Sequence, residues 1–146
     1  FAYVLLRTHF HLLVRIKDPS PARSDRPARS PTQQFSNLFN SYAKSINKAY
    51  GRTGSLFQKR FGRIPITSDA HFAALVRYIH FNPQKHGFVS DFRKYPYSSY
   101  QMVLSDQTTR LKRDAVLEWF GDKASFVEFH RDSPEIRGLA GLIDDD

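Results

Sequence analysis

Two histidines, His9 and His11, alternate with apolar residues in the segment Thr8-His9-Phe10-His11-Leu12-Leu13-Val14. Residues i and i+2 of a β-strand point to the same face, so the two imidazoles are expected to lie side by side. Such a pair could bind one metal ion, because imidazole is a common metal ligand. The alternative is a pair of ordinary strand histidines, since two ligands are too few to complete a metal site.

A tyrosine and a carboxamide share one side of a predicted helix. Apolar periodicity predicts this helix over residues 69–81, and Pro83 is expected to end it near Asn82. Tyr78 and Asn82 are four residues apart, so they lie on the same flank, one turn from each other. By itself this pattern is also typical of a structural tyrosine at the margin of an amphipathic helix.

The composition indicates a single domain with its own hydrophobic core. The chain has 146 residues and no cysteine, which excludes disulfides and thiolate metal sites and suits the cytosol. No apolar stretch approaches the roughly 18 residues of a membrane-spanning helix, and no basic leader or cleavage site marks a signal peptide. The sequence begins at Phe1 inside an apolar run, as expected of a fragment of a longer chain.

The net charge of +8 is unevenly distributed along the chain. Residues 1–100 hold 16 Lys and Arg against 4 Asp and Glu, whereas residues 101–146 hold 6 against 10. A basic body with an acidic tail favours a polyanionic partner, of which nucleic acid is the first candidate. The alternative is a generally basic protein without such a partner.

The elements that would position these residues begin with a β-hairpin. Two strands are predicted over residues 1–6 and 10–16, with a tight connection at Arg7-Thr8. Residues 17–31 contain four prolines and no apolar periodicity, which predicts a loop. Three arginines of this loop could contact phosphates or could simply be solvated: Arg23, Arg26 and Arg29.

A long helix and an extended segment are predicted next. The helix covers residues 32–50, with Thr32 or Ser30 as its cap. The extended segment, residues 55–67, mixes aromatic and cationic side chains, which suits a strand that packs inward and meets a phosphate backbone or unstacked bases. An ordinary half-buried strand with a charged outer face is the alternative. The cations of this segment are Lys59, Arg60 and Arg63.

Further short helices are predicted towards the C-terminus. The helix over residues 69–81 is capped by Ser68 or Asp69. Later helices are predicted to start at Ser98, to cover residues 113–120 before Gly121, and to cover residues 123–131. The acidic end, residues 144–146, is expected to be disordered. His80 is interpreted as a structural histidine. The histidines to which no functional role is assigned are His71, His80, His86 and His130.

Four motifs occur in order along residues 1–100. They are Ala2-Tyr3-Val4-Leu5 leading to His9-Phe10-His11-Leu12-Leu13-Val14, then Gly54-Ser55-Leu56-Phe57-Gln58-Lys59-Arg60-Phe61, then Tyr78-Ile79-His80-Phe81-Asn82-Pro83, and finally Tyr97-Ser98-Ser99-Tyr100. Together they resemble the HUH single-tyrosine transposases of the insertion-sequence superfamily. Their order and spacing are most similar to the REP-associated tyrosine transposases.

The resemblance implies a role for each residue that matches. His9 and His11 match the paired metal ligands, Tyr78 matches the nucleophile, and Asn82 matches the polar residue that completes the metal site. It implies an α+β fold with a ferredoxin-like antiparallel sheet, a catalytic domain over residues 1–100, and a helical C-terminal extension over residues 101–146. Two departures stand out, because Arg7-Thr8 replaces the usual Pro-Asn and the family's first strand and helix would precede Phe1.

The implied activity is cleavage and rejoining of single-stranded or hairpin DNA, such as REP elements, through a 5′-phosphotyrosine. A neutral ligand set of two imidazoles and an amide suits Mg²⁺ or Mn²⁺, and would also accept Zn²⁺ or Ni²⁺ in vitro. The expected location is the bacterial cytoplasm near the nucleoid, with a monomer or a homodimer both open. Two alternatives are a non-catalytic nucleic-acid-binding module and a metal-dependent hydrolytic nuclease. The candidate DNA contacts are Arg23, Arg26, Arg29, Lys59, Arg60 and Arg63.

Overall fold

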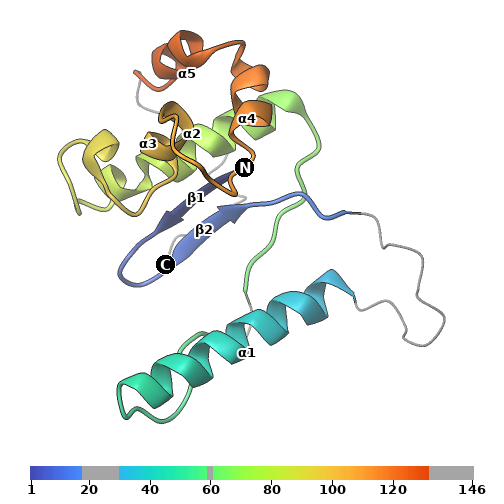
Figure 1. Ribbon diagram of the computed structural model, residues 1–146, viewed down its shortest axis with the longest axis vertical. Helices are drawn as coiled ribbons and strands as arrows, with labels where there is room; N and C mark the ends of the chain where they lie inside the picture. The colour runs from blue at the N-terminus through green and yellow to red at the C-terminus, as the bar shows by residue number, and fades with distance from the viewer. Residues whose placement is uncertain (18–29, 59–60, 132–146) are drawn as a thin grey trace. The chain divides into compact units, whose positions relative to one another are not determined.

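The computed structural model describes residues 1–17, 30–58 and 61–131, and the chain divides into two compact units (Figure 1). Residues 1–15 and 64–146 form one, which we call the hairpin unit, and residues 16–63 form the other, the helix unit. An antiparallel two-stranded sheet and five α-helices confirm the α+β class. Within the described ranges, no helix is long and apolar enough to cross a membrane.

The predicted hairpin is present, with shorter strands. β1 (Ala2–Leu5) pairs antiparallel with β2 (Phe10–Leu13), and the Leu6 N–H donates to the carbonyl of His9 at 2.8 Å to close the turn at Arg7-Thr8. The other edge of β1 meets the segment at residues 97–99 through a single β-bridge. A ferredoxin-like sheet contains more strands than these described residues supply, so this finer part of the fold stays a prediction.

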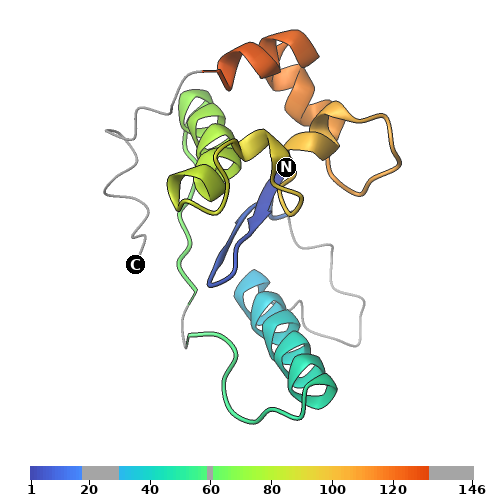
Figure 2. The ribbon, with the colours of Figure 1, turned by 90° about the vertical axis from the view of Figure 1, so that its left-hand side faces the viewer.

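Helix α2 (Asp69–Lys85) packs on the hairpin, as Figures 1 and 2 show. Its N-terminus is capped as predicted, because the Ser68 hydroxyl accepts the N–H of His71 at 3.2 Å. Its inward face is apolar, and the side chains that enter the core are Phe72, Leu75, Val76 and Ile79. This packing fixes the orientation of α2 and therefore the side chains that it turns toward β2.

The predicted end of this helix near Asn82 is wrong, because α2 continues through Pro83 to Lys85. A proline lacks its own N–H and crowds the carbonyl four residues before it, but it does not prevent the residues after it from staying helical, so α2 continues for two residues beyond Pro83. The actual end is set by Gly87 at φ +70°, where the Gly87 N–H donates to Gln84 and the Phe88 N–H donates to Pro83. These two bonds are those of a Schellman cap.

The C-terminal helices complete the core of the hairpin unit. After a 3₁₀ turn at Phe92–Lys94 come α3 (Tyr100–Leu104), α4 (Arg113–Phe120) and α5 (Lys123–Phe129), close to the predicted ranges. Their fully buried side chains are Val103, Val116 and Phe126. These helices therefore pack with β1 and α2, while the functional division at residue 100 stays a prediction.

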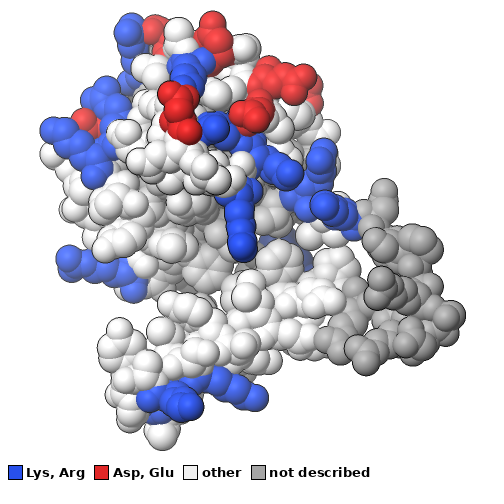
Figure 3. Space-filling model, viewed as in Figure 1, with Lys and Arg blue, Asp and Glu red and all other residues white. Residues whose placement is uncertain are grey.

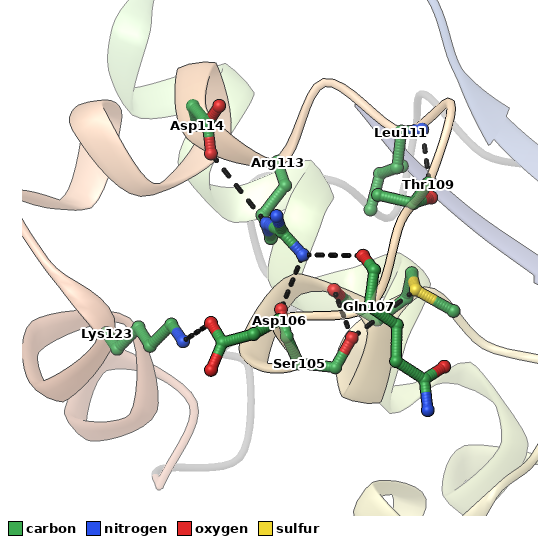
Figure 4. Close-up of polar contacts among 9 residues, drawn as sticks. Ser105, Asp106, Gln107, Thr109, Leu111, Arg113, Asp114 and Lys123 are labelled. Carbon is green, nitrogen blue, oxygen red and sulfur yellow. Dashed lines mark hydrogen bonds and ion pairs between the residues drawn. The ribbon is translucent and has the colours of Figure 1, made fainter.

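Polar contacts hold the connection between α3 and α4 (Figure 4). The Arg113 guanidinium donates to the carbonyls of Ser105 and Gln107, and the Lys123 ammonium lies 2.7 Å from the Asp106 carboxylate. Because both ends of this connection are bonded, α4 and α5 are tied to the end of α3. The predicted disorder of residues 144–146 concerns positions outside the described residues.

The helix unit is built on α1 (Pro31–Ala49), which Ser30 caps through the Gln33 N–H at 3.2 Å. The expected strand within residues 55–67 is wrong, since the described part of that segment contains turns and irregular backbone. Among the residues that the structure describes, no strand pairs with this segment. Instead, the rings of Phe57 and Phe61 pack on Phe39 of α1, with centroid distances of 5.2 and 5.3 Å.

Candidate metal and tyrosine site

The two histidines lie next to each other, as the alternation predicts. His11 is in β2 and His9 directly precedes that strand. Their ring centroids are 5.2 Å apart and the ring planes are nearly perpendicular, at 82°. The hairpin therefore brings two imidazoles to one face, facing α2.

His9 has one ring nitrogen bonded and the other without a partner. Its Nδ1 lies 3.0 Å from the Thr8 hydroxyl. Its Nε2 is buried and has no hydrogen-bond partner. A contact at one ring nitrogen commonly fixes the tautomer of a metal-binding histidine, so Thr8 leaves Nε2 as the atom that can bind a metal. Thr8 replaces the asparagine usual at this position in the family that the motifs resemble, and it touches the predicted ligand.

Tyr78 lies on α2 beside this pair. Its ring centroid is 5.6 Å from that of His11, and the Lys85 ammonium lies 5.1 Å from its ring centroid. The side chain is only 1% exposed. Tyr78 thus lies beside the histidine pair, where the resemblance implies a nucleophile, and the side chains that cover it must move before a substrate can reach it.

Asn82 is fully buried one turn further along α2, and its amide is unpaired. Neither Oδ1 nor Nδ2 has a hydrogen-bond partner. Burying an unpaired amide costs about 1–3 kcal/mol. A structural role does not compensate this cost, whereas a ligand bound to Oδ1 would.

Ring contacts at the residues four before and four after Asn82 join α2 to both histidines. Tyr78, Asn82 and His86 are spaced by four residues and so follow one flank of α2. His11 packs on the first of them, and His9 packs on the last with a centroid distance of 5.1 Å. Asn82 lies on the helix between these two contact points.

His86 and Lys85 are the residues of this site that the sequence reasoning missed. The signal for His86 was the same four-residue spacing that joins Tyr78 to Asn82. It was overlooked because the helix was predicted to end before residue 86. Among the described residues, no three His, Cys, Asp or Glu side chains are arranged to hold a metal ion. A site built on His9 and His11 therefore needs a ligand of another type, which the Asn82 amide can supply.

The opposite face of α2 is held by a buried chain of hydrogen bonds. His130 Nδ1 donates to the carbonyl of Phe126 at 2.7 Å, so its Nε2 can accept from His80 Nδ1 at 2.9 Å. His80 Nε2 then accepts from the Ser99 hydroxyl at 2.8 Å, and that oxygen accepts the Tyr3 N–H of β1 at 2.9 Å. These bonds tie α2 to β1 and α5 and agree with the structural interpretation of His80.

His80 and His130, the two histidines of these buried hydrogen bonds, are held neutral. Burial lowers the pKa of His80 well below its usual range, and the neighbouring His130 adds to the lowering. Burial also lowers the pKa of His130 to about 4. Each ring can therefore accept one bond and donate another at neutral pH, as the chain requires.

Most of the predicted DNA contacts lie outside the described residues. This holds for Arg23, Arg26, Arg29, Lys59 and Arg60. Arg63 is described and exposed, and its guanidinium donates to the Thr32 hydroxyl of α1. On the face drawn in Figure 3, Asp and Glu gather over the hairpin unit near α4 and α5.

Comparison with known proteins gives one informative match. A protein of Haemophilus influenzae, provisionally named as a REP-associated tyrosine transposase, is 32% identical over 102 residues, covering 68% of this chain and 57% of that protein. The chain is similar to a transposase. It spans a little over half the length of this relative. No protein-family model matches the chain, and no solved structure matches it significantly.

Proposed function

We propose that this chain carries the strand-cleaving and strand-joining site of a tyrosine transposase that acts on single-stranded or hairpin DNA. One observation carries the proposal: α2 presents Tyr78 beside His11 and His86 beside His9, with the unpaired amide of Asn82 between them. The name of the H. influenzae relative supports the same activity.

In the proposed reaction the Tyr78 hydroxyl attacks a DNA phosphodiester. A bond forms between the tyrosyl oxygen and phosphorus, the bond to the 3′ oxygen breaks, and the proton lost by tyrosine is balanced by one gained at the 3′-hydroxyl. One phosphodiester is exchanged for another, so the bond energy is stored and the step reverses without a nucleotide cofactor. The ring of His11 at 5.6 Å restricts how the Tyr78 ring can turn.

The residues present fit a divalent cation, Mg²⁺ or Mn²⁺. His9, His11 and Asn82 would hold it, and the fit rests on the buried, unpaired His9 Nε2 and Asn82 Oδ1. When bound, the cation would neutralise charge on the phosphate oxygens. Since all three ligands are neutral, the protein would cancel none of the positive charge of the cation.

The charge distribution supports a DNA partner for the helix unit. Residues 16–63 hold 10 Lys and Arg against 2 Asp and Glu, a net charge of +8, whereas the rest of the chain holds 12 of each. All of the net positive charge thus belongs to this one unit. Phosphate contacts of this kind predict binding that weakens as salt rises.

The test uses a pool of single-stranded and hairpin oligonucleotides that carry a fluorophore at the 3′ end. The protein is incubated with Mg²⁺, Mn²⁺ or EDTA and run on a denaturing gel. We expect a metal-dependent covalent adduct that is lost in Tyr78→Phe, while DNA binding is retained. The control is Tyr97→Phe, because Tyr97 is 61% exposed and lies outside the site.

Two other results would replace the proposal. Cleavage that survives Tyr78→Phe and leaves free 5′ ends would indicate a hydrolytic nuclease. Salt-sensitive binding without cleavage under either metal would indicate a non-catalytic binding module. The burial of Tyr78 is compatible with this alternative, because a module that only binds DNA needs no exposed tyrosine hydroxyl.

A further inference from the structure

His86 lies where α2 ends and contacts a predicted metal ligand. Its backbone N–H donates to the carbonyl of Asn82 at 3.0 Å, so the last turn of α2 connects these two residues directly. Its ring packs edge-to-face on that of His9, with a centroid distance of 5.1 Å and an interplanar angle of 73°. The centroid of the Phe88 ring lies 6.2 Å from that of His86.

Three residues contact the ring of His9. Thr8 contacts Nδ1, His11 packs edge-to-face at 5.2 Å, and His86 packs edge-to-face at 5.1 Å. The atom that these contacts leave available is the buried Nε2. We propose that His86 is a positioning residue that holds the His9 ring in the orientation needed for metal binding.

This inference rests on the metal site of the proposed function and adds a residue to it. His86 is not assigned as a third imidazole ligand, because within the described residues no three His, Cys, Asp or Glu side chains can hold one ion. Its role is carried by the edge of an aromatic ring against His9. Hydrogen-bonded partners that orient a metal-binding histidine typically change metal affinity by about 10–100-fold when they are removed, and we expect the same range for this ring contact.

The helix cap makes this support rigid. Gly87 adopts φ +70°, and the Phe88 N–H donates to the Pro83 carbonyl at 2.9 Å. The cap fixes the backbone on both sides of His86 and places Phe88 against its ring. The proline and glycine that flank this turn therefore determine where His86 meets His9.

The experiment measures metal binding by the DNA-free protein and requires no turnover. Mn²⁺ affinity is measured by titration calorimetry, and Co²⁺ is added as a spectroscopic probe of the ligand field. The variants are His86→Ala, which removes the ring, and His86→Phe, which keeps an aromatic edge but no nitrogen. The control is His71→Ala, a partly buried histidine of the same helix for which no contact with His9 is found.

We expect His86→Ala to weaken Mn²⁺ binding by about 10–100-fold. His86→Phe should lose much less than tenfold in affinity and keep the Co²⁺ spectrum of the wild type, since packing and not coordination is proposed. His71→Ala should leave the affinity unchanged. Thermal unfolding of each metal-free variant checks that it is folded.

Two results would overturn the inference while the proposed function stands. Equal losses in His86→Ala and His86→Phe, with an altered Co²⁺ spectrum, would make His86 a ligand. Unchanged affinity in both variants would remove it from the site. A wild-type protein that binds neither metal would instead refute the metal site itself, and the role of His86 with it.

Discussion

The Asn82→Leu substitution is expected to stabilise the metal-free protein while it abolishes the proposed metal site. Leucine has nearly the shape of asparagine and carries no polar atoms. The Asn82 side chain is fully buried, and both its amide atoms lack hydrogen-bond partners. Replacing it therefore removes a desolvation cost and breaks no bond of the side chain.

The size of the effect follows from that cost. An unpaired buried amide is destabilising by about 1–3 kcal/mol. For a chain of this length, 1 kcal/mol corresponds to roughly 3–4 °C in the midpoint of thermal unfolding. In EDTA, Asn82→Leu should thus unfold roughly 3–12 °C above the wild type, as followed by circular dichroism. Excess Mn²⁺ should raise the midpoint of thermal unfolding of the wild type but not that of Asn82→Leu.

Gln84 provides a matched control on the same helix. Its Oε1 accepts the backbone N–H of Phe92 at 3.1 Å, so this carboxamide is paired. Gln84→Leu should lower the free energy of unfolding by about 1 kcal/mol or more. A midpoint for Asn82→Leu that falls as far as that of Gln84→Leu would refute the reasoning, because the Asn82 amide would then be a structural group.

Three further predictions concern the supports of the site. As the pH falls from 6.5 to 4, unfolded His130 takes up a proton that the buried ring, with its pKa lowered to about 4, does not, so His130 alone should lower the free energy of unfolding by about 3 kcal/mol. His80, whose pKa burial also lowers, should add to this fall, and in urea titrations His130→Gln should show a clearly weaker pH dependence than the wild type. Gly87→Ala should lower the free energy of unfolding by about 1–2 kcal/mol, because alanine is strained at φ +70°. Gly62→Ala should leave it unchanged in the same assay, since a Cβ at either glycine meets no atom within 4 Å and Gly62 has no positive φ. Thr8→Val should weaken Mn²⁺ binding by about tenfold through loss of the contact at His9 Nδ1, and an unchanged affinity would separate Thr8 from the site.

Local patterns predicted the elements whose boundaries are set by local chemistry. The hairpin follows from alternation on either side of Arg7-Thr8, and the start of α2 follows from Ser68, whose hydroxyl accepts a helical N–H. Gly121 ends α4 at a positive φ of 95°, as predicted. Each of these boundaries depends on residues within a turn of it.

The end of α2 shows where such reasoning failed. The presence of Pro83 predicts an end of the helix near Asn82, but α2 continues through Pro83 and ends at the cap formed by Gly87. The same error hid His86, since the four-residue spacing from Asn82 has meaning only if the helix continues. A wrong boundary therefore removed one residue from the candidate site.

Other features depend on contacts between distant parts of the chain. The buried chain from Tyr3 through Ser99 and His80 to His130 joins residues that are far apart in the sequence. The near-complete burial of Tyr78 also arises from tertiary packing. No spacing rule indicates either of them. They determine how firmly α2 is held and how a substrate can reach the tyrosine.

The central claim is that Tyr78 forms the covalent bond to DNA, and peptide mapping of the adduct tests it most directly. Trypsin cuts after Arg77 and Lys85, which releases residues 78–85 as a peptide with a single tyrosine. After reaction with Mn²⁺ and digestion of the DNA, mass spectrometry should find a 5′-linked nucleotide on Tyr78, absent in EDTA. A nucleotide on Tyr97 or another tyrosine, or cleaved DNA without any modified peptide, would contradict the claim.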